Sequence, residues 1–139
     1  MAGPSTELLR RIPLFAGLQP KELERLGGSF KERTFQAGEK IASEGEAGAG
    51  FFVIESGEAV VDVGGDERGR LGPGDYFGDV ALIDMGARTA TVIAESDLHT
   101  YGLTFWDFRP LVESDARIAW PLLQVMAKRL REAEAAPTA

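Results

Sequence analysis

Glycine interrupts the middle of this chain every few residues, and this spacing limits what the chain can fold into. Between residues 29 and 103, short apolar segments rich in β-branched and aromatic residues alternate with glycine-containing turns. No long helical pattern separates these segments, which argues against a doubly wound parallel sheet. Many short strands in one small region are typical of a sandwich, a jelly roll or a barrel. The segments that we expect to be strands are KERTFQ, KIAS, FFVIE, EAVVDV, YF, TATVIAE and LHTYGL.

Helical patterns flank this region on both sides. Before it, we expect short helices at about residues 5–26, with Ser5 as a cap and Pro20 at a first helical position. After it, we expect helices at about residues 104–134, where Thr104 can cap the first and Pro121 predicts a kink or a restart. The first helices have an apolar face that must pack against another part of the chain. The residues of this face are Leu14, Phe15, Leu18, Leu23 and Leu26. The sequence therefore predicts a single domain over residues 1–139, mainly β with flanking helices.

Composition excludes several classes of function. The chain has 139 residues and a net charge of -7, which argues against nucleic-acid binding because phosphate contacts need clustered cations. It has no cysteine, so disulfides, thiol catalysis and thiolate metal sites are excluded. No apolar run approaches the ~18 residues of a membrane span, and the first residues do not form a signal pattern. We therefore expect a cytoplasmic protein that contacts neither nucleic acid nor membrane.

The residues most often found in active sites do not form a catalytic set here. His99 is the only histidine, too few for the metal site of a cupin-like barrel, and its apolar neighbours indicate an ordinary strand residue. There is no Walker loop and no convincing Ser-His-Asp arrangement, so we expect neither an enzyme nor a bound metal. Trp106 and Trp120 are expected to pack within helices. A solvated hairpin is the expected place of Asp62, Asp66 and Glu67.

The segment FGDVALIDMGARTATV, residues 77–92, has a different character. Gly78 precedes a short helical turn whose backbone amides can attract an anion, and Arg88 can return a guanidinium to the same anion. Thr89 adds a hydroxyl beside it. Asp79 would repel phosphate but accepts hydrogen bonds from sugar hydroxyls. A nucleotide offers both groups; the alternative is that Arg88 and Asp79 simply pair with each other in an exposed loop.

This segment resembles the phosphate-binding cassette of the cyclic nucleotide-binding domain family, whose pattern is approximately F-G-E-x-A-L, a variable loop and P-R-x-A-T-V. The likeness extends to FQAGEKIASEGEAGAGFFVIESGEAVV and to LGPGDYFGD, and it covers about residues 14–131. The resemblance implies a double-stranded β-helix, or jelly roll, over about residues 29–103. It also implies short N-terminal helices and a C-terminal lid helix.

The resemblance also implies a role for each residue of the segment. Gly78 lets the backbone approach the ligand, and Asp79 stands where the family has a glutamate that binds the ribose 2′-hydroxyl. Arg88 matches the arginine that pairs with the cyclic phosphate. Thr89 and Ala90 are similar to positions that offer backbone or hydroxyl contacts. The apolar side of the cassette helix, which we expect to pack inward, consists of Val80, Ala81 and Leu82.

Two departures from the family pattern bear on the ligand. Asp79 is one methylene shorter than glutamate, and Ala87 replaces a usual proline before the arginine. A lengthened or lost charge-assisted hydrogen bond costs about 1.5–3 kcal/mol, or about ten- to a hundredfold in affinity. Thr89 is compatible with both nucleotides, and we favour cAMP over cGMP as the ligand. The alternative is a degenerate member that acts as a protein interaction module without nucleotide.

The last helix is the expected lid. The resemblance implies that it covers the base, with a hinge at about residues 105–112. The residues expected over the base are Leu123, Met126, Ala127 and Leu130. Only eight residues follow Arg131, too few for a helix-turn-helix, so we expect output through an effector protein or through a homodimer along the last helix.

Overall fold

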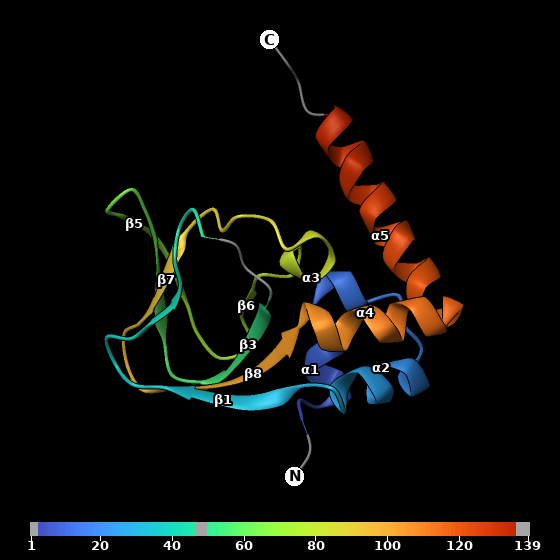
Figure 1. The fold of residues 1–139 in the computed structure, drawn as a ribbon, viewed down its shortest axis with the longest axis horizontal. Coiled ribbons are helices and arrows are strands. Elements are labelled where there is room, and N and C mark those ends of the chain that lie inside the picture. Colours follow the sequence, from blue (N-terminus) through green and yellow to red (C-terminus); the bar gives the residue numbers. More distant parts are fainter. Residues whose placement is uncertain (1–2, 47–49, 136–139) are drawn as a thin grey trace.

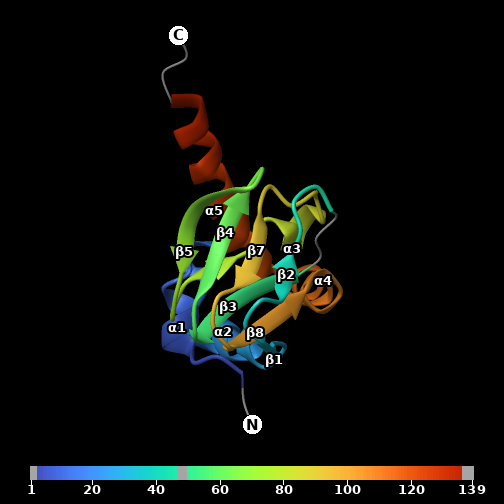
Figure 2. The ribbon, with the colours of Figure 1, turned by 90° about the vertical axis from the view of Figure 1, so that its left-hand side faces the viewer.

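Two four-stranded antiparallel sheets form the body of the protein. The computed structural model describes residues 3–46 and 50–135, and the sheet orders within them are β1-β8-β3-β6 and β2-β7-β4-β5. The sheets face each other as a roll, on the left of Figure 1 and toward the viewer in Figure 2. The predicted jelly roll with flanking helices is confirmed. The strands are β1 (Lys31–Phe35), β2 (Lys40–Ala42), β3 (Gly50–Ser56), β4 (Ala59–Val63), β5 (Asp66–Leu71), β6 (Tyr76–Phe77), β7 (Thr91–Ala94) and β8 (Leu98–Thr104).

Strand β3 shows how the first sheet serves two cores. Its side chains alternate between faces, as the two-residue period of a strand requires. Phe51 and Val53 are fully buried in the core shared with the helices, while Ile54 is buried in the core between the two sheets. Phe52 lies between the sheets with Phe77, and the two rings stack with 5.3 Å between their centroids. The apolar run FFVI therefore packs against the helices on one face and against the second sheet on the other.

The helices lie on the side of the first sheet that faces away from the roll, as Figure 1 shows. The two predicted caps are confirmed: the Leu8 amide donates to Ser5 Oγ at 3.1 Å, and the Asp107 amide donates to Thr104 Oγ1 at 3.1 Å. The predicted apolar face of the first helices is buried. The helices are α1 (Thr6–Arg10), η1 (Pro13–Phe15), α2 (Pro20–Gly27), α3 (Ala81–Asp84), α4 (Phe105–Ser114) and α5 (Ala116–Ala135).

Helix α5 begins against the body and ends away from it (Figure 1). Its first half is anchored by the buried side chains Ile118 and Leu122. Pro121 lies inside the helix without ending it. The helical conformation breaks instead at Asp115, which has φ −144° and ψ 107°, whereas α4 is continuous through residues 105–112, where we expected the hinge.

Two sequence expectations, one on a strand and one on the tryptophans, differ from the structure. Strand β5 was not predicted because its segment DERGRL is charged and largely exposed; it forms by pairing with β4. Trp106 and Trp120 were expected to pack within helices, but their exposed fractions are 63% and 62%. None of the described helices is long and apolar enough to cross a lipid bilayer.

Candidate functional site

A pocket of about 430 Å³ lies at the segment that connects β6 to β7. This volume is within the range of small-molecule sites, about 300–1,000 Å³. Ala42, Phe77 and Val92 contribute apolar surface to its wall. The lining also includes all seven residues predicted from the sequence: Gly78, Asp79, Val80, Ala81, Arg88, Thr89 and Ala90.

Gly78 brings the backbone against the guanidinium of Arg88. Its φ is +88°, a left-handed conformation that residues with a side chain rarely adopt. A Cβ atom at this position would lie 2.5 Å from Arg88 Nη1 and 2.5 Å from the Gly50 carbonyl oxygen. Glycine is therefore required here both by conformation and by space.

Arg88 is the cation of the pocket, and it is half-buried. Its Nη2 donates to the Gly50 carbonyl at 2.7 Å, and its backbone amide donates to the Glu46 carbonyl at 2.8 Å. Burial lowers the pKa of the guanidinium, yet an arginine remains charged at neutral pH. A guanidinium has five N–H donors, so the bond to Gly50 leaves others for an anion in the pocket.

Asp79 and Asp84 are the two carboxylates that line the pocket, and Asp79 accepts hydrogen bonds from α5 and from the following residue. Arg129 Nη2, from α5, donates to Asp79 Oδ2 at 2.9 Å, and the Val80 amide donates to Asp79 Oδ1 at 3.0 Å. The side chain of Asp79 is 17% exposed. The alternative of an Arg88–Asp79 ion pair is therefore wrong, because Arg88 bonds to Gly50 and Asp79 bonds to Arg129.

Arg129 was missed as a site residue. Helix α5 continues to Ala135, so Arg129 does not lie in its last turn. The signal was the helical period, because Arg129 follows the buried Leu122 by seven positions and Ile118 by eleven. It therefore projects from the face of α5 that meets the body.

The amides at the start of α3 are largely used within the chain. The Val80 amide bonds to the Asp79 side chain, and the Ala81 and Leu82 amides donate to the Gly78 and Asp79 carbonyls at 3.1 and 3.2 Å. The expectation that these amides are free for an anion is wrong, because the turn closes on itself. The charge that remains for an anion is that of Arg88.

The other predicted residues divide between wall and rim. Ala81 and Leu82 are buried, as expected for the inner side of the cassette helix. Val80 was expected to pack inward, but it is 49% exposed because it precedes α3 and lies at the pocket rim. Thr89 is exposed and Ala90 is half-buried, so the hydroxyl of Thr89 is accessible from solvent.

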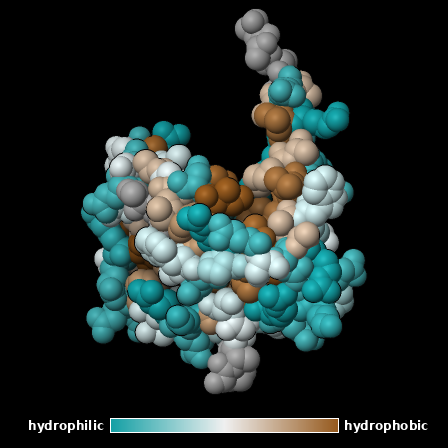
Figure 3. Space-filling model, turned by 45° about the vertical axis from the view of Figure 1, so that its right-hand side comes forward, coloured by the Kyte–Doolittle hydropathy of each residue, from teal (hydrophilic) through white to brown (hydrophobic). Residues whose placement is uncertain are grey.

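The α5 residues expected over the base lie elsewhere in this structure. Leu123 and Met126 line a second pocket of about 540 Å³ between α3, α4 and α5, and that pocket is mainly apolar. Ala127 and Leu130 are exposed. Figure 3 shows hydrophobic side chains gathered at the base of the hollow beside α5. In the described residues, no group of three or more His, Cys, Asp or Glu side chains is arranged to hold a metal ion.

Comparison with known proteins identifies the family. The sequence model of the "Cyclic nucleotide-binding domain" matches residues 32–115, which is more than half of the chain. The chain belongs to the cyclic nucleotide-binding domain family. The resemblance inferred from the cassette and from the glycine pattern is confirmed.

Relatives within the cyclic nucleotide-binding domain family occur in bacteria and fungi. The chain is 34% identical over 131 residues to a cyclic AMP receptor protein of Thermus thermophilus, covering 91% of this chain and 61% of that protein. It is 40% identical over 92 residues to a cAMP-dependent protein kinase regulatory subunit of Mycosarcoma maydis, covering 63% of this chain and 18% of that one. The chain thus spans only part of these relatives.

A solved structure with a similar fold covers nearly the whole chain. It is the N-terminal domain of a transcriptional regulator from Streptomyces coelicolor A3(2), with a TM-score of 0.85 and 31% identity. The alignment covers 95% of this chain and 98% of that domain. The helices are therefore shared with this relative as well as the roll.

Proposed function

We propose that this chain is a regulatory module that binds a cyclic mononucleotide, with cAMP preferred over cGMP. The observation that carries the proposal is that one pocket is lined by a half-buried guanidinium and a carboxylate that do not pair with each other. Arg88 suits a phosphate, and Asp79 suits a hydroxyl donor. A cyclic nucleotide carries both groups, and relatives described as cAMP receptors and regulatory subunits support this ligand.

Each part of the ligand has a proposed contact. The cyclic phosphate bonds to the guanidinium of Arg88, and the absence of a side chain at Gly78 keeps that guanidinium in place. A ribose hydroxyl donates to Asp79, and the Thr89 hydroxyl lies at the rim beside the phosphate. Ala42 and Val92 offer the ligand apolar surface.

Asp79 also offers a route from the ligand to α5. Arg129 holds this carboxylate at the pocket wall, so the site is partly preorganised for a hydroxyl donor. A ligand that binds Asp79 changes the environment of the Arg129 contact. Because a ligand shifts a conformational equilibrium through differential contacts, the position of α5 becomes sensitive to the nucleotide.

The partner that we propose is a second copy of this chain, bound along α5. Its exposed apolar side chains repeat at intervals of three and four residues, the spacing of a two-helix seam. These seam residues are Trp120, Leu123, Ala127 and Leu130. The other candidate partner is an effector protein that covers the same seam. We also propose that the module is cytoplasmic.

A second candidate function is a protein interaction module that does not bind nucleotide. It is favoured by Asp79, because both of its carboxylate oxygens already accept hydrogen bonds from the chain. The apolar pocket between α3, α4 and α5 gives such a module a surface to use.

Thermal unfolding with a panel of nucleotides distinguishes the two candidates. A ligand at 100 times its dissociation constant stabilises the folded state by about 2.7 kcal/mol, or roughly 10 °C in melting temperature for a domain of this size. We expect cAMP to give the largest shift, cGMP a smaller one, and 5′-AMP, which lacks the cyclic phosphate, little or none. No shift with millimolar cyclic nucleotide would support the interaction module instead.

A further inference from the structure

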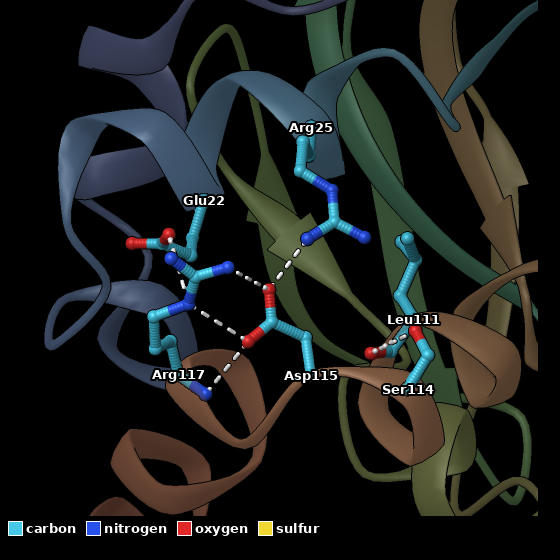
Figure 4. A network of polar contacts seen from close by, with 6 residues as sticks. All are labelled: Glu22, Arg25, Leu111, Ser114, Asp115 and Arg117. Atoms are coloured by element: carbon cyan, nitrogen blue, oxygen red, sulfur yellow. Dashed lines mark hydrogen bonds and ion pairs between the residues drawn. The ribbon is translucent and has the colours of Figure 1, made fainter.

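A network of charged side chains fastens the junction between α4 and α5 to α2 (Figure 4). At its centre is Asp115, a carboxylate that is only 8% exposed. Arg25 Nη1, from α2, donates to Asp115 Oδ2 at 2.5 Å. Arg117 Nε and Nη2, from α5, donate to Oδ1 and Oδ2 at 3.1 and 3.2 Å. One carboxylate thus joins two helices.

Asp115 also fixes the first turn of α5. Its Oδ1 accepts from the Arg117 amide at 2.9 Å, and its carbonyl accepts from the Ile118 and Ala119 amides at 3.0 and 3.1 Å. These bonds satisfy donors that a helix start leaves without partners inside the helix. Asp115 therefore interrupts the helical conformation after α4 and also orients the first turn of α5.

Helix α2 is a firm anchor for this network. Leu23 and Leu26 are fully buried in the core beneath it. Glu22, also from α2 and only 3% exposed, places Oε2 3.8 Å from Arg117 Nε. Arg117 therefore lies between two carboxylates, Asp115 at the junction and Glu22 on α2, and the start of α5 is tied to a helix that is buried in the core.

The geometry of α5 makes its starting direction important. Arg129 lies thirteen residues beyond the first residue of the helix, Ala116, a distance of about 20 Å along the axis. A rotation of about 10° at the junction would move the helix by roughly 3.5 Å at Arg129. That displacement exceeds what the 2.9 Å hydrogen bond to Asp79 can tolerate.

We propose that Asp115, held by Arg25 and Arg117, is a positioning residue that sets the direction of α5 and thereby places Arg129 beside Asp79. The effect on nucleotide affinity rests on the proposed function. The direction of α5 does not, and it can be measured without nucleotide.

The first test measures the direction of α5 by distances between spin labels. The chain has no cysteine, so Asp66→Cys and Glu132→Cys provide unique labelling sites on β5 and α5. We expect Asp115→Asn and Arg25→Gln each to broaden or shift the distance distribution by several ångströms. Asp107→Asn is the matched control, because it breaks the 3.5 Å pair of Asp107 with Lys31 at the other end of α4.

The outcomes of this test separate clearly. Asn is a good capping residue, so Asp115→Asn removes the charge while it can still cap α5. Arg25→Gln leaves Asp115 intact, and it serves if the first variant unfolds. A parent-like distribution in either folded variant would overturn the proposal, as would equal broadening in the Asp107→Asn control.

The second test asks whether Asp115 acts through Arg129. We expect Asp115→Asn to weaken cAMP binding about three- to tenfold in the parent chain and to have no further effect in an Arg129→Gln background. Equal weakening in both backgrounds would overturn the positioning role. A parent chain that binds no cyclic nucleotide, with a distance distribution that still broadens, would contradict the proposed function but not the role of Asp115 in directing α5.

Discussion

Replacing Gly78 by alanine tests how the turn controls the cation of the pocket. The new Cβ would lie 2.5 Å from Arg88 Nη1 and 2.5 Å from the Gly50 carbonyl oxygen, where ordinary contacts begin at 3.4 Å. The guanidinium must therefore move by about 1 Å or more, and the backbone carbonyl of Gly50 cannot move as easily. We expect Gly78→Ala to reduce both stability and nucleotide affinity.

The size of each effect follows from the contacts. A side chain at positive φ costs about 1–2 kcal/mol, and forcing an atom into occupied space typically costs about 1–3 kcal/mol more. Displacement of Arg88 also weakens a charge-assisted hydrogen bond to the phosphate, which is worth about 1.5–3 kcal/mol, or about ten- to a hundredfold in affinity.

Gly74→Ala is the matched control for this substitution. Gly74 has φ +90°, close to the +88° of Gly78, but a Cβ at Gly74 would have nothing within 4 Å. The two variants share the backbone strain, so their difference isolates the contacts of the new Cβ with Arg88 and with the Gly50 carbonyl. Thermal unfolding should place Gly78→Ala roughly 4–12 °C below Gly74→Ala, and calorimetry should show weaker cAMP binding for Gly78→Ala alone. Equal melting temperatures and equal affinities would refute this reasoning.

Three further predictions concern other parts of the chain. Asp79→Asn should weaken cAMP binding about tenfold in calorimetry, whereas Asp84→Asn at the same pocket should not. Hydrogen bonds from Arg117 lower the pKa of Asp115 to about 2, so the contribution of this carboxylate to stability is complete above about pH 4 and is lost as the pH falls toward 2. Between pH 5 and pH 3, the free energy of unfolding measured with denaturant should therefore fall less for Asp115→Asn than for the parent chain. Leu130→Glu should convert the proposed α5 dimer into a monomer in analytical ultracentrifugation, whereas the Gln124→Glu variant should remain dimeric.

The sequence predicted those features that depend on neighbouring residues. Turn glycines and short apolar runs indicated a sandwich, a jelly roll or a barrel, and the family resemblance selected the jelly roll. The caps at Ser5 and Thr104 form with amides three positions away. Most of the residues that line the pocket belong to one continuous segment, so the pocket could be predicted from the sequence of that segment. Gly78 and Arg88 are close in sequence, although the Gly50 carbonyl and the Glu46 carbonyl also help to hold Arg88.

Features that depend on distant residues could not be predicted in the same way. The partner of Asp79 is Arg129, fifty positions away, and the partner of Asp115 is Arg25, ninety positions away. Strand β5 exists through its pairing with β4, because its own residues carry no apolar alternation. Tertiary contacts decide these features, and an isolated pattern of residue types does not contain them.

The most direct measurement is a calorimetric titration of cAMP into the parent chain, Arg88→Ala and Arg68→Ala. Arg68 is an exposed arginine on β5 and lies outside the pocket, so its substitution controls for the loss of one positive charge. We predict that Arg88→Ala weakens binding at least ten- to a hundredfold while Arg68→Ala binds like the parent. Parent-like affinity in Arg88→Ala would contradict the assignment of the phosphate to this pocket.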